Sequence, residues 1–244
     1  GLSVGSHSLM STQFLLGATV NNNKRYEREL MPQYFKLAKK IATGAHFIIS
    51  QIDWDSRKQD ELLRYMALHN LRVPVIANVY ILNRRTAQFF SSGKIPGVVV
   101  HPHLLQLAEK QAASLDKGKS FFLELAAKQL AIARGLGYRG VYFGGLTSLT
   151  DFNRIIEIEG SYGTEDWRHF TSDIYYPFSD SFYYFEPGTT SGTNSEKVNQ
   201  VYLDSLQENA RLNLRRQVPV SFKLSRQVHK KFFQPDTSGF RKGQ

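Results

Sequence analysis

Hydrophobic residues recur along positions 1–160 with two alternating periods, one typical of strands and one typical of helices. The run 13–21 predicts a strand, and 26–43 predicts an amphipathic helix that ends at Gly44. The apolar face of this helix consists of Leu30, Tyr34, Leu37 and Ile41. Further strands are predicted at 46–51, 73–79 and 139–145, and further helices at 56–70, 83–93, 102–115, 120–137 and 148–160. Ser56 is the predicted N-cap of the second helix.

This alternation predicts a parallel sheet, because parallel neighbours must be joined by crossover connections. An open doubly wound sheet and a barrel both fit the pattern. A complete eight-stranded barrel takes roughly 250 residues, whereas four βα units occupy about the first 160 residues here. If the sheet belongs to a barrel, a missing N-terminal half or a partner chain must supply four more strands, since unpaired strand edges in a core are costly.

Polar side chains follow the predicted strands where each strand ends. The strand at 46–51 contains the run Phe47, Ile48 and Ile49, which is typical of a strand covered on both faces, yet it finishes in Ser50 and Gln51. Ligands of parallel sheets bind at the carboxyl ends of the strands. The residues at these ends are Thr19, Asn21, Ser50, Gln51, Asp53, Asn78, Tyr80, Gly144 and Gly145.

Most of these strand-end residues are neutral, which indicates a site that holds its ligand by uncharged hydrogen bonds. Gln51 can both donate and accept, so it suits the edge of a pterin or a flavin. A buried amide that is satisfied by neighbouring backbone is the alternative. Asp53 and Asp55 are separated by one residue and could face the same side of an extended segment, but this spacing alone does not establish a catalytic carboxylate pair.

Other candidate sites are weaker. The first predicted helix has a basic edge, which a solvated surface or an anion site would both explain. Its members are Gln33, Lys36, Lys39 and Lys40. His101 and His103 lack a third ligand at a suitable spacing, so we predict no metal site.

The composition changes after residue 160. Residues 167–185 hold nine aromatics in nineteen positions. They either pack an extension against the rest of the protein or form a stacking surface for a flat cofactor. The segments 202–214 and 221–233 predict short basic helices, and nine Lys or Arg against one Asp give residues 211–244 about +8 of the formal +10 charge. We interpret this segment as a solvated or partner-docking tail and expect no nucleic acid partner, since no standard binding motif is present.

Composition narrows the class of protein further. A hydrophobic content of 41% is sufficient for a globular core, and no apolar run approaches the roughly 18 residues needed to span a bilayer. The absence of cysteine excludes disulfides and thiolate chemistry and is compatible with the cytoplasm, where we expect this protein to act.

The order of these segments resembles the C-terminal half of the methylenetetrahydrofolate reductases, which are flavin-dependent (β/α)8 barrels. The resemblance covers roughly residues 13–158. It is carried by "FLLGATVN", "LAKKIATGAHFIISQIDWD", "LRVPVIANVYILN" and "GYRGVYFGG". It implies that residues 1–160 form the C-terminal half of a TIM-type barrel and that 161–244 form an aromatic and basic C-terminal extension.

The resemblance also implies roles for particular residues. Gln51 would contact the folate, and Gln88 would be a second folate contact if a one-residue shift is allowed. The basic edge, Gln33, Lys36, Lys39 and Lys40, would hold FAD, with NAD(P)H as co-substrate. No catalytic residue is predicted in this chain, because the family's general acid lies on earlier strands.

Two functions follow from this comparison. The first is a methylenetetrahydrofolate reductase-like oxidoreductase that transfers hydride between NAD(P)H, FAD and the one-carbon unit of tetrahydrofolate, within an oligomer. The second is a non-catalytic folate- or flavin-binding assembly subunit. The second gains support because "VNNNKRYERE" and "GGLTS" replace the family's "YP..HPE" and "LNR" segments, which removes a histidine near the flavin and an arginine associated with folate.

Overall fold

The computed structural model describes residues 3–4, 7–8, 14–95, 97–146 and 148–215. Residue contacts divide the chain into one unit, Gly1–Asn199, and a second, Gln200–Gln244. The second unit contains helix α8 (Gln200–Arg215), which agrees with the helix predicted at 202–214. The helix predicted at 221–233 and most of the basic tail lie outside the described residues.

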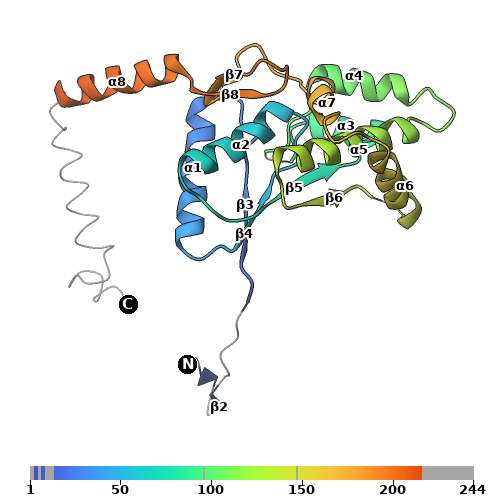
Figure 1. The fold of residues 1–244 in the computed structure, drawn as a ribbon, viewed down its shortest axis with the longest axis horizontal. Coiled ribbons are helices and arrows are strands. Elements are labelled where there is room, and N and C mark those ends of the chain that lie inside the picture. Colours follow the sequence, from blue (N-terminus) through green and yellow to red (C-terminus); the bar gives the residue numbers. More distant parts are fainter. Residues whose placement is uncertain (1–2, 5–6, 9–13, 96, 147, 216–244) are drawn as a thin grey trace. The chain divides into compact units, whose positions relative to one another are not determined.

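The first unit is built on a parallel sheet whose strands lie side by side in the order in which they occur in the chain (Figure 1). The strands are β3 (Gly17–Val20), β4 (Phe47–Ser50), β5 (Val75–Tyr80) and β6 (Gly140–Gly144). The connecting helices are α1 (Glu27–Ala42), α2 (Ser56–Leu68), α3 (Arg84–Ser91), α4 (Pro102–Gln111), α5 (Lys119–Leu136) and, after β6, α6 (Leu149–Gly160). The predicted α/β class with a parallel sheet is therefore confirmed.

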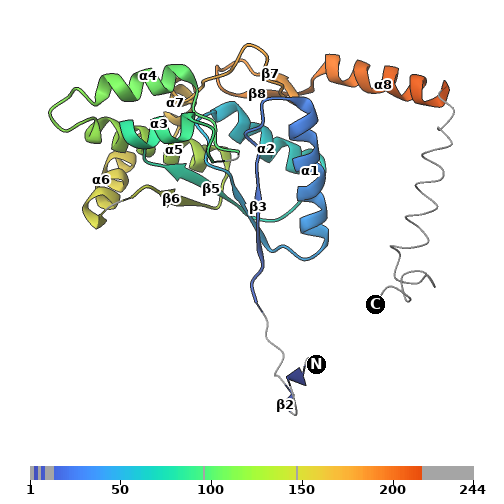
Figure 2. The same cartoon turned by 180° about the vertical axis from the view of Figure 1, so that it is seen from behind.

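The helices gather on one side of this sheet, as opposite views show (Figures 1 and 2). Burial alternates accordingly along β5, where Val75, Ala77 and Val79 are buried and the residues between them are only half-buried. In β4 the same alternation leaves Phe47 and Ile49 half-buried. Within the described residues helices cover one face of this strand, and whether its other face is also covered stays a prediction.

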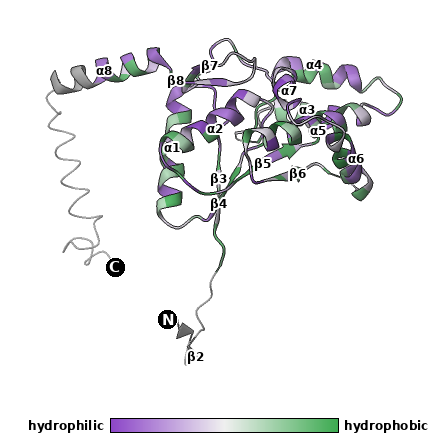
Figure 3. Cartoon of the chain, in the orientation of Figure 1, coloured by the Kyte–Doolittle hydropathy of each residue, from purple (hydrophilic) through white to green (hydrophobic). Residues whose placement is uncertain are grey.

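The hydrophobic core lies between the sheet and these helices. One cluster joins Val79 to α5 and α6 through Ala126, Ala127 and Ile155. A larger cluster joins α3, α4 and α5 to the loop after β4, and Trp167 and Ile174 of the extension belong to it. Hydropathy colouring shows the green, hydrophobic residues of β5 and α5 in this region (Figure 3).

Residues beyond α6 wrap against α2 and α5 rather than adding a strand to the sheet. They form α7 (Trp167–Asp173) and an antiparallel pair, β7 (Phe185–Pro187) with β8 (Asn194–Val198). Gly135 of α5 provides the space for Trp167, since a methyl group built there would lie 2.3 Å from the indole. The aromatic segment thus packs as part of the folded unit. A further antiparallel pair, β1 (Ser3–Val4) and β2 (His7–Ser8), lies near the N-terminus.

The extension also covers the start of helix α2. Its first six residues, Ser56 to Glu61, are all buried, although all six are polar or charged. The N-cap is Asp55, whose carboxylate accepts from the amides of Arg57 and Lys58, so the prediction that Ser56 is the cap is wrong by one residue. The Ser56 hydroxyl instead contacts the backbone oxygens of Thr171 (2.7 Å) and Gly192 (2.9 Å). No helix in the described part of the chain is both long and apolar enough to cross a membrane.

Candidate functional site

Two carboxamides meet at the carboxyl ends of β3 and β4. The backbone amide of Gln51 donates to the Val20 oxygen at 2.9 Å, which places the side chains of Asn21 and Gln51 on neighbouring strand ends. The Asn21 Nδ2 donates to the Gly97 oxygen at 3.3 Å. A methyl group built on Gly97 would lie 3.6 Å from the Gln51 Nε2, so this loop crosses both side chains.

Hydrogen bonds within the protein explain part of why β4 ends in the polar residues Ser50 and Gln51. The Gln51 Oε1 accepts from the amide of Ile52 at 2.9 Å, which fixes one end of the carboxamide and leaves the Nε2 toward the Gly97 loop. The Ser50 hydroxyl accepts from the Asn78 amide at 3.2 Å. Because the β4 and β5 backbones pair only as far as Ile49 and Ile76, this hydroxyl takes the place of a lost backbone acceptor.

Asn78 supplies a third carboxamide at this edge. The β4–β5 register aligns Ile49 with Ile76, so Gln51 and Asn78 occupy equivalent levels on adjacent strands. The Asn78 Oδ1 is buried and has no hydrogen-bond partner within the described residues. A buried acceptor without a partner is costly, and a donor on a bound molecule would satisfy it. We call Asn21, Gln51 and Asn78 the amide rim.

The predicted FAD-binding residues lie along α1 and have different environments. Lys36 and Lys39 are exposed, whereas Gln33 and Lys40 are half-buried. The Lys40 Nζ donates to the Thr19 oxygen on β3 at 2.6 Å. Within the described residues no hydrogen bond joins any of the four to the amide rim.

Gln88, the second predicted folate contact, is an exposed residue of α3. Its Nε2 donates to the Glu109 Oε1 on α4 at 3.1 Å. The structure brings Gln51 together with Asn21 and Asn78, but it does not join Gln88 to them by a hydrogen bond in the described part of the chain.

A buried network of carboxylates directly follows β4, and the sequence reasoning did not identify it. Asp53 accepts from the Asn22 Nδ2 (2.9 Å), the Asp55 amide (2.8 Å) and the Gln59 Nε2 (3.3 Å). Burial, followed by the charge of Asp55, raises the pKa of Asp53 to about 7. The only signal in the sequence is the Asp-Trp-Asp-Ser stretch before a helix, and this pattern fits a cap as well as a site.

Residues of the extension form further hydrogen bonds with the buried charged residues at the start of α2. The Tyr183 hydroxyl donates to Asp55 at 2.6 Å, and the Lys58 Nζ donates to the Phe182 oxygen at 2.5 Å. Glu61 accepts from the Tyr34 hydroxyl and from the Tyr184 amide. Burial raises the pKa values of both Asp55 and Glu61, while these hydrogen bonds act in the opposite direction. Through these hydrogen bonds the two carboxylates join α1, α2 and the extension.

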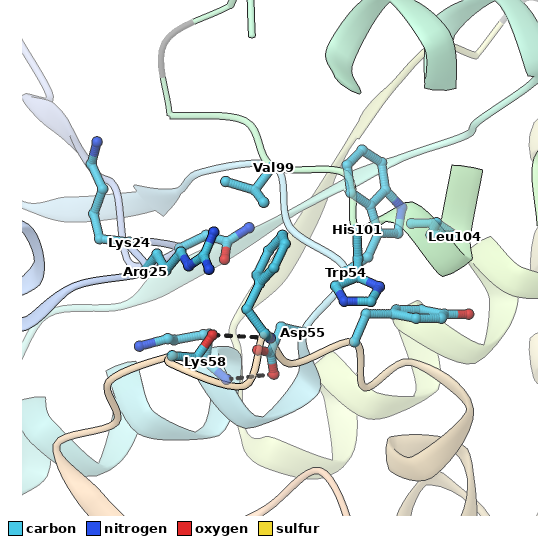
Figure 4. Close-up of a pocket in the computed structure, with 12 residues that line it drawn as sticks. Lys24, Arg25, Trp54, Asp55, Lys58, Val99, His101 and Leu104 are labelled. Atoms are coloured by element: carbon cyan, nitrogen blue, oxygen red, sulfur yellow. Dashed lines mark hydrogen bonds between the residues drawn. The ribbon is translucent and has the colours of Figure 1, made fainter. Parts of the chain in front are cut away.

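A small pocket lies above Asp55 and Lys58, with Trp54 and His101 on one side and Lys24 and Arg25 on the other (Figure 4). Its volume is about 30 Å³, enough for a water molecule but not for an organic ligand. Burial, then the neighbouring His103 and Arg25, lowers the pKa of His101, so this side chain is neutral at neutral pH.

A larger pocket of about 240 Å³ lies at the carboxyl ends of β5 and β6. Its apolar lining residues are Ile81, Leu82, Leu123 and Leu146, and its polar lining residues are Asn83, Asp116, Lys117, Lys119 and Asp151. Lys119 and Asp151 form an ion pair at 2.7 Å. Hydrogen bonds from the Ser120 side chain and backbone, followed by that from Ser114, lower the pKa of Asp116. This volume is close to the lower end of the range for small-molecule sites, roughly 300 Å³.

Comparison with known proteins assigns no family: no family model matches the chain, and no curated protein matches it. Among the described residues no group of three or more His, Cys, Asp or Glu is arranged to hold a metal ion. The amide rim, on the sheet that carries it, is the candidate ligand site.

Proposed function

We propose that this chain is the ligand-binding half of a methylenetetrahydrofolate reductase-like oxidoreductase with a (β/α)8 barrel. Support comes from the sequential order of four parallel strands with helices on one side, which is the arrangement of successive barrel units. The amide rim lies at the carboxyl ends of these strands, where barrels bind their ligands. Cytoplasmic folate metabolism is the proposed setting.

The observation that carries the proposal is the unsatisfied Asn78 Oδ1 beside Gln51. A pterin presents amino and ring N–H donors next to a carbonyl, and two adjacent carboxamides complement such an edge. Gln51 and Asn78 would orient this ring, while Asn21 would hold the Gly97 loop beside it. Gln88 is a further proposed folate contact, which requires its bond to Glu109 to open.

The α1 surface fits an anionic cofactor in part. Lys36 and Lys39 are exposed and form no ion pair within the described residues, so both are available to the phosphates of FAD. The Lys40 ammonium group already donates a hydrogen bond to the Thr19 oxygen. Gln33 lies one helical turn before Lys36. When bound, FAD supplies the hydride chemistry between NAD(P)H and the one-carbon unit, and the protein supplies placement and electrostatics.

The second candidate is a non-catalytic folate- or flavin-binding assembly subunit. One observation favours it: the amide rim is uncharged, and the two carboxylates that follow β4, Asp53 and Asp55, already form structural hydrogen bonds. A proton donor for the reductase reaction would then have to come from strands outside this chain.

Flavin titration tests the proposal. FAD fluorescence is followed as the full chain is added, and NADH and methylenetetrahydrofolate are then supplied in turn. The double substitution Lys36→Ala and Lys39→Ala should weaken FAD binding roughly tenfold, because two cationic contacts are lost. Lys110→Ala, an exposed lysine on α4, is the matched control and should leave FAD binding unchanged. Binding with bleaching by NADH supports the reductase, binding without bleaching supports the second candidate, and no binding of FAD or folate removes both.

A further inference from the structure

The pocket of about 240 Å³ at the carboxyl ends of β5 and β6 occupies the position where parallel sheets bind their ligands. Its apolar lining comes from the segments that follow these two strands and from Leu123 of α5. Its charged lining comes from the turn between α4 and α5 and from the starts of α5 and α6. The charged residues are Asp116, Lys117, Lys119 and Asp151. The pocket therefore has one apolar part and one charged part.

Both carboxylates of this pocket already have partners. Asp116 accepts from the amides of Gly118 (3.0 Å) and Ser120 (2.7 Å) and thereby caps the start of α5. Asp151 pairs with the Lys119 ammonium group at 2.7 Å. Because the Lys119 side chain is 58% exposed, this ion pair contributes little to stability, and a second anion can share the ammonium group.

Lys117 is the remaining charged residue of the pocket. Its side chain is exposed and forms no hydrogen bond or ion pair with the part of the chain that the structure describes. Its backbone has a φ of +56°, a left-handed conformation that glycine adopts more easily than lysine does. The hydrogen bonds of Asp116 hold the turn in this conformation. A lysine at such a strained position indicates that its ammonium group has a role.

We propose that this pocket binds a small amphiphilic anion, which consists of one ring or a short alkyl chain with a phosphate or carboxylate group. The apolar part of the ligand packs against Leu82, Leu123 and Leu146, and the Lys117 and Lys119 ammonium groups bind its anionic group. The pocket is smaller than the roughly 300–1,000 Å³ of sites for drug-sized ligands, so the apolar part is no larger than one ring. The inference is independent of the proposed function, because no residue of the amide rim lines this pocket.

Saturation-transfer difference NMR of the full chain with phenyl phosphate and with benzoate tests the inference. We expect saturable binding of at least one probe, with a dissociation constant of about 1 mM or lower. Inorganic phosphate lacks an apolar part, so it should displace the bound probe only at roughly tenfold higher concentration. The probe that binds more tightly identifies the anionic group as a phosphate or a carboxylate.

Lys117→Gly removes the ammonium group and relieves the left-handed backbone. It should weaken binding of the tighter probe roughly fivefold without lowering the Tm of the protein, a combination that a purely structural role of Lys117 would not produce. Lys117→Glu should weaken binding further, because it places a second negative charge beside the ligand. Lys110→Ala, at an exposed lysine of α4 outside the pocket, is the matched control and should bind the probe as the wild type does.

Failure of both probes to bind, or equal binding to the wild type and Lys117→Gly, overturns the inference. Gln51→Ala should bind the probe as the wild type does, and a loss in this variant would place the probe at the amide rim and also overturn the inference. A wild-type protein that binds the probe but no tetrahydrofolate would remove the proposed function alone.

Discussion

The Tyr183 hydroxyl donates a hydrogen bond to the Asp55 carboxylate at 2.6 Å, although 128 residues separate the two. Asp55 is at the same time the N-cap of α2, so one carboxylate holds both the start of that helix and the extension that covers it. Arg57 lies 3.8 Å from the centre of the Tyr183 ring and places a cation on its face. The extension is therefore fastened to the unit that carries the amide rim.

Tyr183→Phe keeps the ring and removes only the hydroxyl. We expect a loss of about 1.5–3 kcal/mol in the free energy of unfolding, because a hydrogen bond to a buried carboxylate is broken. Urea denaturation measures it. Tyr175→Phe is the matched control, since its hydroxyl is 3.5 Å from the Arg57 Nη1 and contributes little. Equal losses in the two variants would contradict the role given to Tyr183.

Two helical glycines should respond oppositely to alanine. At Gly135 the new methyl group would collide with the Trp167 indole at 2.3 Å, so we expect destabilisation of about 1–3 kcal/mol from overpacking. At Gly160 nothing lies within 4 Å of the added methyl group, and we expect stabilisation of up to about 1 kcal/mol from helix propensity. Thermal unfolding of both variants compares them directly. A stabilising Gly135→Ala would show that the extension does not pack on α5 as described.

Asn194→Ala should loosen the β7–β8 pair selectively. The Asn194 side chain donates to the Arg57 oxygen (2.8 Å) and to Asp60 (3.0 Å) and accepts from the Arg57 Nε (2.9 Å). Its removal leaves buried charged groups with fewer partners, at a cost of about 1–3 kcal/mol. Hydrogen exchange should accelerate in residues 185–198 and not in β5. Glu196→Gln, at a side chain that is 95% exposed, should leave exchange unchanged.

Asp53 should make stability depend on pH in a defined direction. Its pKa is raised from 3.8 to about 7 in the folded protein, so the folded state binds the proton more tightly than the unfolded state. The stabilising effect is complete below about pH 4 and is lost as the pH rises toward 7, by up to about 4 kcal/mol. Asp53→Asn should remove this part of the pH dependence. Urea midpoints between pH 4 and 8 measure it, and an unchanged slope in the variant would contradict the assignment.

The elements with strong helical or strand periodicity could be predicted from sequence. Helix α1 spans Glu27–Ala42 against a prediction of 26–43, because its apolar face is regular and Gly44 ends it. The β7–β8 pair could not be predicted, since β8 reads Asn-Ser-Glu-Lys-Val and has no alternating apolar face. Its position is set by Arg57 and Asp60 of α2, which are distant in sequence.

The positions of the candidate site residues could be predicted because the ends of the strands could be predicted. Asn21, Gln51 and Asn78 lie at neighbouring ends because the strands are parallel and in sequence order. The buried positions of Asp53, Asp55 and Glu61 were not predictable, because charged residues at the start of a helix usually face solvent. The extension covers Asp55 and Glu61 through Tyr183 and Tyr184, and its docking on α2 has no local signal. Asp53 is instead bonded by Asn22 and Gln59.

In the proposed function the amide rim binds the ring of a folate. Isothermal titration calorimetry of the full chain with tetrahydrofolate tests it most directly. Gln51→Ala and Asn78→Ala should each weaken binding by about 10- to 100-fold, as expected for loss of one or two buried hydrogen bonds. Gln207→Ala, an exposed glutamine of α8, should bind as the wild type does. A wild-type protein that binds no tetrahydrofolate, or equal affinities in all four proteins, would contradict the claim.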